Sequence, residues 1–176
     1  MPAIGFLDYV DGRYEASIED LEEFPHEASD LDDLYQPKAM LEGITYLAMN
    51  DGARARGACE SARQHLEKEI AEVPRDARKR ASMGLTLACL GRKEEAIREA
   101  RLAADLKPVS VDALDGPSYQ DNLARVYAMV GEPDAACDIL EKLLSHSSGA
   151  AVNLLRLDPI WVPLRTFPRF RNIIGS

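Results

Sequence analysis

The sequence is poor in aromatic residues, cysteine and histidine, and it has no long apolar run. Aromatics make up 6% of the 176 residues, whereas hydrophobic residues of all kinds reach 46%. This content is enough for a buried core, and the abundance of Ala, Leu, Glu and Arg favours helix over sheet. No apolar stretch approaches the roughly 20 residues that span a bilayer. The first residues also lack the basic and apolar regions of a secretory signal. We therefore expect neither a membrane segment nor an export signal.

Cysteine is too sparse and too scattered to form a framework. The three cysteines, Cys59, Cys89 and Cys137, are odd in number and far apart, and no C-x-x-C is present. This spacing indicates neither a zinc site nor a disulfide scaffold. We expect three reduced, partly buried thiols in a reducing compartment, and hence a cytoplasmic protein.

Recognisable catalytic and metal-binding patterns are missing as well. His26, His65 and His146 stand apart, without an H-x-x-x-H partner, and no nucleophile-elbow, P-loop or dinucleotide-binding motif occurs. The stretch "DLDDLYQPKAMLE" resembles a calcium loop, but Tyr35 replaces the required glycine and Leu41 the bidentate glutamate. We expect no enzyme, no cofactor and no metal site.

Charge is unevenly distributed along the chain. The net charge is −9, and residues 1–35 hold eleven acidic side chains against the single base Arg13. An acidic chain lacks the clustered Lys and Arg that nucleic-acid binding requires, so we expect no nucleic-acid partner. The acidic run is interpreted as a solvated face, with a docking surface for a basic partner as the alternative.

A four-fold repeat is the main positive signal. "LGRKEEAI" and "VGEPDAAC" share a glycine, a polar pair and an alanine five residues later. With Gly12 and Asn50, the glycines Gly91 and Gly131 form a series of turn anchors spaced 38, 41 and 40 residues apart. Both residue types readily adopt the left-handed conformation that ends a helix.

Other positions keep the same register. Small residues lie seven before the anchors (Gly5, Gly43, Gly84, Ala124) and five after them (Ser17, Ala55, Ala96, Ala136). Large residues lie four before three of the anchors (Tyr46, Leu87, Tyr127), and Asp8 is the exception. Small residues let two helix axes approach closely, and the large residue fills the space beside them.

These residues resemble the tetratricopeptide repeat (TPR). In "MGLTLACLGRKEEAIREARLAADLKP" the consensus positions are filled by Gly84, Leu87, Gly91, Ala96, Ala103 and Pro108. The aromatic residue usual early in the first helix is replaced by Arg80 and Gln120, and the period exceeds the usual 34. Over most of its length, and most strongly from about Lys68 to the end, the chain is also similar to the C-terminal TPR arm of bacterial multidomain regulators. In that family the arm follows kinase, cyclase or winged-helix modules. Val162 departs from this pattern, which has an acidic residue after the tryptophan.

The predicted fold is an all-α, right-handed superhelix in a single domain, residues 1–176. Its four repeats are expected at about 1–24, 36–72, 76–107 and 117–147, followed by a cap at 148–176. The expected helices cover 3–11, 14–24, 36–49, 52–72, 76–90, 93–106, 117–130 and 133–146. An acidic linker is expected at 25–35. In the cap, we expect Leu154, Leu155, Leu157, Trp161, Leu164 and Phe170 to cover the last repeat; a docking role for Trp161 and the nearby arginines is the alternative.

The concave face of such an array is lined by the first helix of each pair, and it is the candidate binding surface. The predicted partner-binding residues are Met40, Ile44, Leu47, Arg78, Leu85, Cys89, Asp121, Arg125 and Met129, continuing from Phe6, Tyr9 and Val10. An apolar groove suits a helical or extended segment of a protein. The alternative is that these side chains only pack between neighbouring helices.

We therefore predict a non-catalytic scaffold that binds a protein or peptide in a bacterial regulatory system. The alternative is a module that forms a homodimer by stacking through Ile4, Phe6 and Leu7 of its first repeat.

Overall fold

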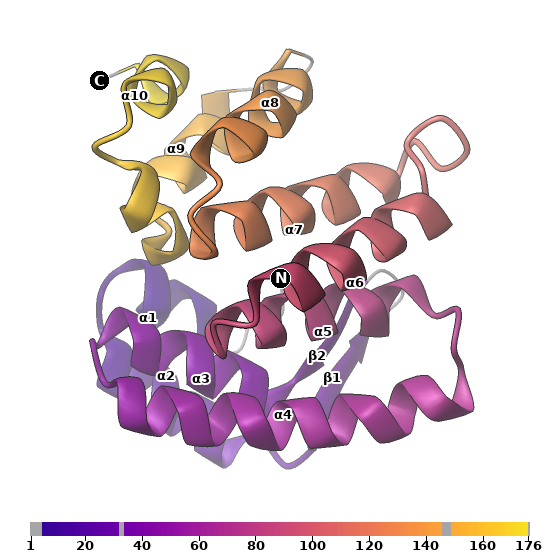
Figure 1. Cartoon of the computed structure of the whole chain (residues 1–176). Coiled ribbons are helices and arrows are strands. Elements are labelled where there is room, and N and C mark those ends of the chain that lie inside the picture. The colour runs from indigo at the N-terminus through magenta and orange to yellow at the C-terminus, as the bar shows by residue number, and fades with distance from the viewer. Residues whose placement is uncertain (1–4, 32–33, 146–148, 176) are drawn as a thin grey trace.

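The fold is an all-α solenoid of helix pairs, with one short β-hairpin inserted after the first pair (Figure 1). This computed structural model describes residues 5–31, 34–145 and 149–175. The paired helices are α1 (Phe6–Val10) with α2 (Tyr14–Glu23), α3 (Lys38–Ala48) with α4 (Gly52–Glu72), α5 (Ala77–Cys89) with α6 (Lys93–Leu106), and α7 (Gly116–Met129) with α8 (Pro133–Leu144). The C-terminal segment holds α9 (Gly149–Leu157), the 3₁₀ helix η1 (Pro159–Leu164) and α10 (Pro168–Ile174). The predicted fold class is confirmed.

Each helix pair turns at the residue that the repeat spacing singled out. The backbone φ angles are 77° at Gly12, 59° at Asn50, 72° at Gly91 and 77° at Gly131. Among the described residues, Asn50 is the one non-glycine with positive φ. A left-handed residue directly after a helix reverses the chain and lets the next helix pack back on the first.

Small residues allow close approach within the pairs, as the register predicts. A Cβ atom on Gly43 would lie 2.3 Å from the sulfur of Cys59, and one on Gly84 would lie 3.0 Å from the Cβ of Ala100. The small residues that follow the anchors are all buried: Ser17, Ala55, Ala96 and Ala136. The helix axes are therefore closer than larger side chains would permit.

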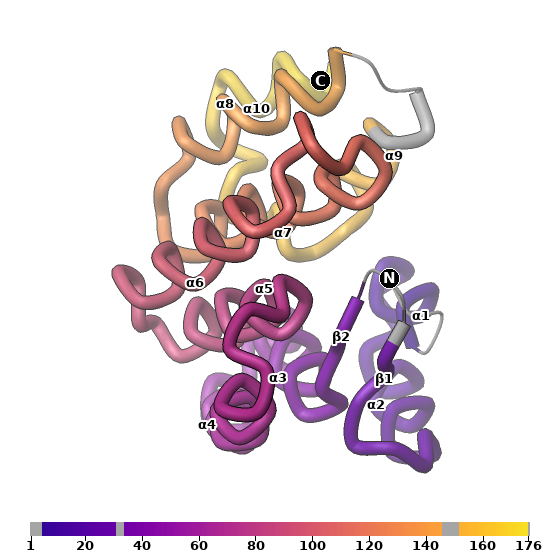
Figure 2. Tube along the Cα trace, turned by 90° about the vertical axis from the view of Figure 1, so that its right-hand side faces the viewer, coloured from indigo at the N-terminus to yellow at the C-terminus, as the bar shows by residue number. Residues whose placement is uncertain are grey.

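The segment expected to be an acidic linker forms a β-hairpin instead. Strands β1 (Ala28–Leu31) and β2 (Leu34–Pro37) pair antiparallel, with Ala28 opposite Pro37. The hairpin lies between α2 and the helices α3 and α5 (Figure 2). The hydroxyl of Ser82 in α5 donates a hydrogen bond to the carbonyl oxygen of Tyr35 in β2. This tertiary contact is invisible in local sequence, and the expectation of a structureless linker was wrong here.

The C-terminal segment caps the array, although not with every residue expected. Buried as predicted are Leu155, Trp161, Leu164 and Phe170. Leu154 and Leu157, however, are 47% and 53% exposed, so their assignment to the cap core was wrong. Both lie on the outer side of the short helix α9, whereas Leu155 turns inward.

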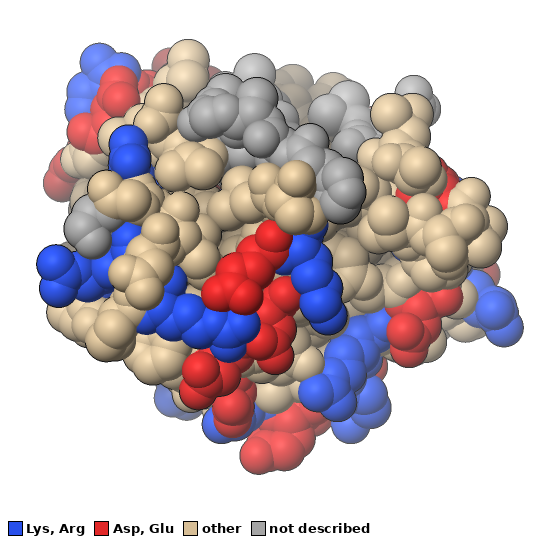
Figure 3. Space-filling model, turned by 90° about the horizontal axis from the view of Figure 1, so that it is seen from above, with Lys and Arg blue, Asp and Glu red and all other residues tan. Residues whose placement is uncertain are grey.

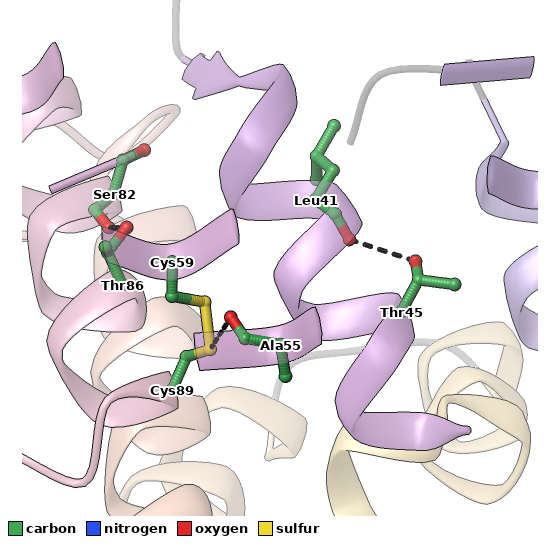
Figure 4. Close-up of a disulfide and its surroundings, with 7 residues drawn as sticks. All are labelled: Leu41, Thr45, Ala55, Cys59, Ser82, Thr86 and Cys89. Atoms are coloured by element: carbon green, nitrogen blue, oxygen red, sulfur yellow. Dashed lines mark hydrogen bonds between the residues drawn. A yellow bond between two sulfur atoms is a disulfide. The ribbon is translucent and has the colours of Figure 1, made fainter. Parts of the chain in front are cut away.

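Two of the three cysteines are joined, which corrects the expectation of three reduced thiols. A disulfide links Cys59 in α4 to Cys89 in α5 (Figure 4). Cys137 is free and buried. The bridge connects the second helix pair to the third, and only the packing of α4 on α5 brings the two residues together. The cysteine argument for a reducing compartment therefore no longer holds.

Candidate interaction site

Segments of the chain itself cover much of the concave face. Strand β2 packs against α3 and α5, while η1 packs against α7 and α3 (Figure 2). Met40 and Leu85, two of the predicted binding residues, are consequently buried in the core. The predicted stripe is therefore not a continuous open groove, and all of its residues except Arg78 line at least one of three recesses.

Four predicted residues meet in one of these recesses, beside η1. Ile44 and Leu47 of α3, Cys89 of α5 and Met129 of α7 line a space of about 420 Å³. Leu47 is exposed, while the other three are half-buried. Since Cys89 is half of the disulfide, its sulfur is a structural link rather than a free contact for a partner.

Arg78 lies apart from all three recesses and has a structural role. Its guanidinium lies 2.7 Å from a carboxylate oxygen of Asp30 in β1 and 2.9 Å from one of Asp76. Burial opposes ionisation of Asp76, but the hydrogen bonds and charge of Arg78 outweigh it and lower the pKa of that carboxyl. Arg78 thus links the hairpin to the start of α5. Its guanidinium, predicted to bind a partner, forms ion pairs within the fold instead.

The largest recess is a groove of about 660 Å³ beside α7, called the α7 groove below. Its floor and walls come from β2, α5, α7, α8, α9 and the loop between α6 and α7. The lining residues are Leu34, Gln36, Leu85, Val109, Ala113, Pro117, Ser118, Asp121, Asn122, Arg125, Leu140, Lys142, Leu143, Leu144, Leu154 and Leu155. A volume of this size is typical of a site that holds a ligand or a few side chains of a partner.

One polar stripe of α7 faces this groove. Ser118, Asp121, Asn122 and Arg125 all line it, and their spacing of three and four residues places them on one side of a helix. The sequence predicted Asp121 and Arg125 but missed Ser118 and Asn122. The same spacing, extended from the two predicted residues, would have found both.

Two amide oxygens at the groove wall have no hydrogen-bond partner among the described residues. They are Oε1 of Gln36, in β2, and Oδ1 of Asn122, in α7. A buried acceptor left unpaired costs about 1–3 kcal/mol. The fold therefore keeps two polar groups unsatisfied at the wall of the α7 groove.

A buried charge cluster forms the inner end of the groove. The guanidinium of Arg125 lies 2.6 Å from a carboxylate oxygen of Asp121 and 2.6 Å from one of Asp158, and it stands over the ring of Trp161 at 5.3 Å. Tyr9 lines the same small cavity as Arg125 and Asp158, and burial, together with the charge of Asp158, raises the pKa of Tyr9 well above its usual value. Tyr9 therefore stays neutral, and the cluster joins α1 to the C-terminal segment across the concave face.

The third recess is a small cavity beneath this cluster. It has a volume of about 50 Å³ and is lined by Met40, Ile44, Leu85 and Arg125, among others. Space of this size holds a water molecule rather than a partner side chain. It belongs to the core of the fold.

A second convergent set of ionisable groups lies where β2 meets α4 and α5. The Tyr35 hydroxyl is 2.7 Å from Nε2 of His65, and Nζ of Lys79 is 2.6 Å from a carboxylate oxygen of Glu69. The hydrogen bond from Lys79 lowers the pKa of Glu69, and burial raises that of Tyr35. None of these four residues lines any of the three recesses.

Across the described ranges, no three or more His, Cys, Asp or Glu side chains gather as a metal would require. None of the described helices combines the length and apolar character needed to cross a bilayer.

Large apolar side chains are exposed in the α7 groove and on the α6–α7 loop beside it. The exposed fractions are 42% for Val109, 83% for Val111, 87% for Leu114 and 47% for Leu154. Val109 and Leu154 also line the groove, and Val111 and Leu114 belong to the same α6–α7 loop as Val109. In Figure 3, uncharged side chains gather at the upper right, with acidic and basic side chains below them at the right edge.

Neither a protein-family model nor a curated protein matches this sequence. Among solved structures the chain is similar to MamA. A MamA mutant aligns with 18% identity and a TM-score of 0.41, over 97% of this chain and 88% of that one. A crystal structure of MamA aligns with 17% identity and a TM-score of 0.42, over 99% and 90%. MamA of MSR-1 gives 20% and 0.39, over 97% and 91%. Likeness at this level does not bear on what this chain binds.

Proposed function

We propose that the chain is a non-catalytic interaction module that binds an apolar peptide or helical segment of a protein partner in the α7 groove. The observation that carries this proposal is a groove of about 660 Å³ that is lined by the exposed Val109 and Leu154 and lies beside the exposed Val111 and Leu114 of the α6–α7 loop. Solitary exposed apolar residues are ordinary on protein surfaces, but several grouped at a concave site mark an interaction surface. Helical and extended segments both bind in such grooves through regularly spaced apolar side chains.

Most of the predicted binding residues are divided between two recesses of the array, and the proposed site contains only some of them. Of the nine predicted residues, Leu85, Asp121 and Arg125 line the α7 groove. Ile44, Leu47, Cys89 and Met129 line the separate recess beside η1. We assign partner binding to the α7 groove because its rim carries the grouped apolar exposure.

The test is a selection of peptide ligands followed by paired substitutions. Peptides selected on the intact chain are measured against Val109→Asp/Leu154→Asp, which places two charges at the groove. The matched control is Val73→Asp/Leu102→Asp, because Val73 and Leu102 are similarly exposed, at 49% and 37%, and line none of the recesses. We expect the first variant to lose binding and the control to keep it, with both retaining wild-type circular dichroism. Equal binding by the two variants would refute the assignment of the groove.

The resemblance to the C-terminal arm of bacterial multidomain regulators supports a partner within a regulatory system. That partner is either a separate protein or another module of a longer chain.

Self-association is the second candidate, and one observation favours it. Leu7 in α1 is 69% exposed, beside the half-buried Phe6; Ile4, the third residue expected in this contact, lies outside the described residues. Light-scattering mass across a wide concentration range decides between the candidates. A dimer that disappears on Leu7→Asp supports stacking through the first repeat, and a constant monomeric mass excludes it.

A further inference from the structure

We propose that the segment bound in the α7 groove carries a lysine or arginine, and that its cationic head group docks against Asp121, Asn122 and Gln36. This inference rests on the proposed function, and it names the chemistry of the partner. Three features of the groove support it: an excess of negative charge at the inner end, unpaired acceptors at the wall, and apolar side chains around them.

The negative charge comes from the number of groups in the buried cluster. One guanidinium, that of Arg125, lies between two carboxylates, those of Asp121 and Asp158. Tyr9 is neutral and adds no positive charge to the cluster, and Asp158 accepts a hydrogen bond from the backbone N–H of Ile160. Asp158 is thereby fully surrounded, at 1% exposure, whereas the Asp121 side chain is 36% exposed. The unbalanced negative charge therefore faces the groove at Asp121.

The wall beside Asp121 offers two unpaired acceptors. The oxygens of Gln36 and Asn122 are acceptors without a partner among the described residues. The last torsion of a side-chain amide turns easily, so a small rotation presents either oxygen to the groove. An ammonium offers three N–H donors and a guanidinium five, with none of their atoms accepting. A cationic head group is thus the ligand type that would satisfy both oxygens and balance Asp121.

Besides Arg125, the α7 groove is lined by one other cationic side chain, Lys142, and its position does not cancel the negative charge at Asp121. Lys142 lies on α8, in the last turn of that helix, and is exposed to solvent. Solvent screens an exposed charge more strongly than a partly buried one. Lys142 therefore affects the rim, while Asp121 acts at the enclosed end beside the apolar floor formed by Leu85 and Leu140.

The first experiment selects random displayed peptides of about 12 residues, a length of roughly three helical turns. Clones are kept only if Val109→Asp/Leu154→Asp abolishes their binding and Val73→Asp/Leu102→Asp does not. We expect the retained clones to be enriched in Lys or Arg flanked by apolar residues.

The second experiment measures the coupling between one such peptide and the groove. Replacing its conserved basic residue by Gln is expected to weaken binding about tenfold or more on the intact chain, because charge-assisted hydrogen bonds are lost. On Asp121→Asn the same replacement is expected to change affinity by no more than about twofold. Asp20→Asn, which removes an exposed carboxylate of α2, is the matched control and should leave the full effect.

The outcomes separate this inference from the proposed function. If groove-dependent clones are acidic or uncharged, or if the coupling to Asp121 is absent, the inference is overturned while the groove assignment stands. If no clone depends on the groove, both are overturned.

Discussion

The ion-pair cluster around Arg125 gives the sharpest test of what holds the two ends of the array together. The perturbation is Arg125→Met, which keeps an apolar stem over Trp161 but removes the positive charge. The side chains of Arg125 and Asp158 are 12% and 1% exposed, so the substitution leaves a buried carboxylate without its cation. Removing one partner of a buried pair costs about 3–5 kcal/mol. In a chain of this length that lowers the melting temperature by roughly 6–20 °C.

Arg169 provides a matched control, because it also binds carboxylates of another element. It joins α10 to Asp138 and Glu141 of α8, both at 2.7 Å, but its side chain is 34% exposed and theirs are 59% and 46% exposed. Exposed pairs contribute about 0–1 kcal/mol. Arg169→Met should therefore lower the free energy of unfolding far less than Arg125→Met in urea titrations at neutral pH.

A second substitution identifies the cause of the loss. In Arg125→Met/Asp158→Asn the buried carboxylate is replaced by a neutral amide, so we expect about half or more of the lost stability to return. The reasoning is refuted if Arg125→Met is no more destabilising than Arg169→Met. It is also refuted if the added Asp158→Asn brings no recovery.

Three further predictions concern the packing of the helix pairs. Gly43→Ala should destabilise the protein by about 1–3 kcal/mol, because its Cβ would lie 2.3 Å from the Cys59 sulfur. Gly57→Ala, whose Cβ would have no atom within 4 Å, should stabilise it by about 0.5–1 kcal/mol. Urea titration measures both effects, and equal effects of the two substitutions would contradict this prediction. Reduction of the Cys59–Cys89 bridge, whose residues are 30 apart in sequence, should lower the free energy of unfolding by about 3–4 kcal/mol according to the chain-entropy model. An unchanged midpoint of urea unfolding in dithiothreitol would rule this out. Burial raises the pKa of Cys137 from 9.0 to about 11, so the contribution of this thiol to stability is complete below pH 9 and declines as pH rises toward 11. Over that pH range the free energy of unfolding should fall less in Cys137→Ala than in the wild type. Parallel curves of unfolding free energy against pH for the wild type and the variant would be evidence against this prediction.

Repeat spacing predicted the helices well because both ends of each helix depend on local sequence. Gly12, Asn50, Gly91 and Gly131 reverse the chain by their own conformational preference, and all four have the positive φ expected of them. Pro133 is likewise a local signal: it occupies the first position of α8, where the N–H that proline lacks would have no partner within the helix. Such signals need no knowledge of the rest of the fold.

The disulfide and the hairpin could not be predicted in this way because they depend on long-range contacts. Cys59 and Cys89 meet only after α4 has packed on α5. The strand β2 holds its place through Ser82, which lies 47 residues beyond Tyr35. An acidic stretch with four-residue strands has no alternating pattern strong enough to mark it as a sheet.

The position of the binding groove follows from these irregular segments rather than from the repeat. A regular array would expose the first helices α3, α5 and α7 along one continuous face. Here β2 covers α3 and α5, and η1 closes over α7 from the other end. The opening that remains lies between β2, α7 and α9, and the amide oxygens of Gln36 and Asn122 at its wall have no hydrogen-bond partner among the described residues. The repeat pattern therefore predicted a correct helix, with Asp121 and Arg125 on the correct side of it. It could not predict that Met40 and Leu85 would be covered, because the segments that cover them stand outside the repeat.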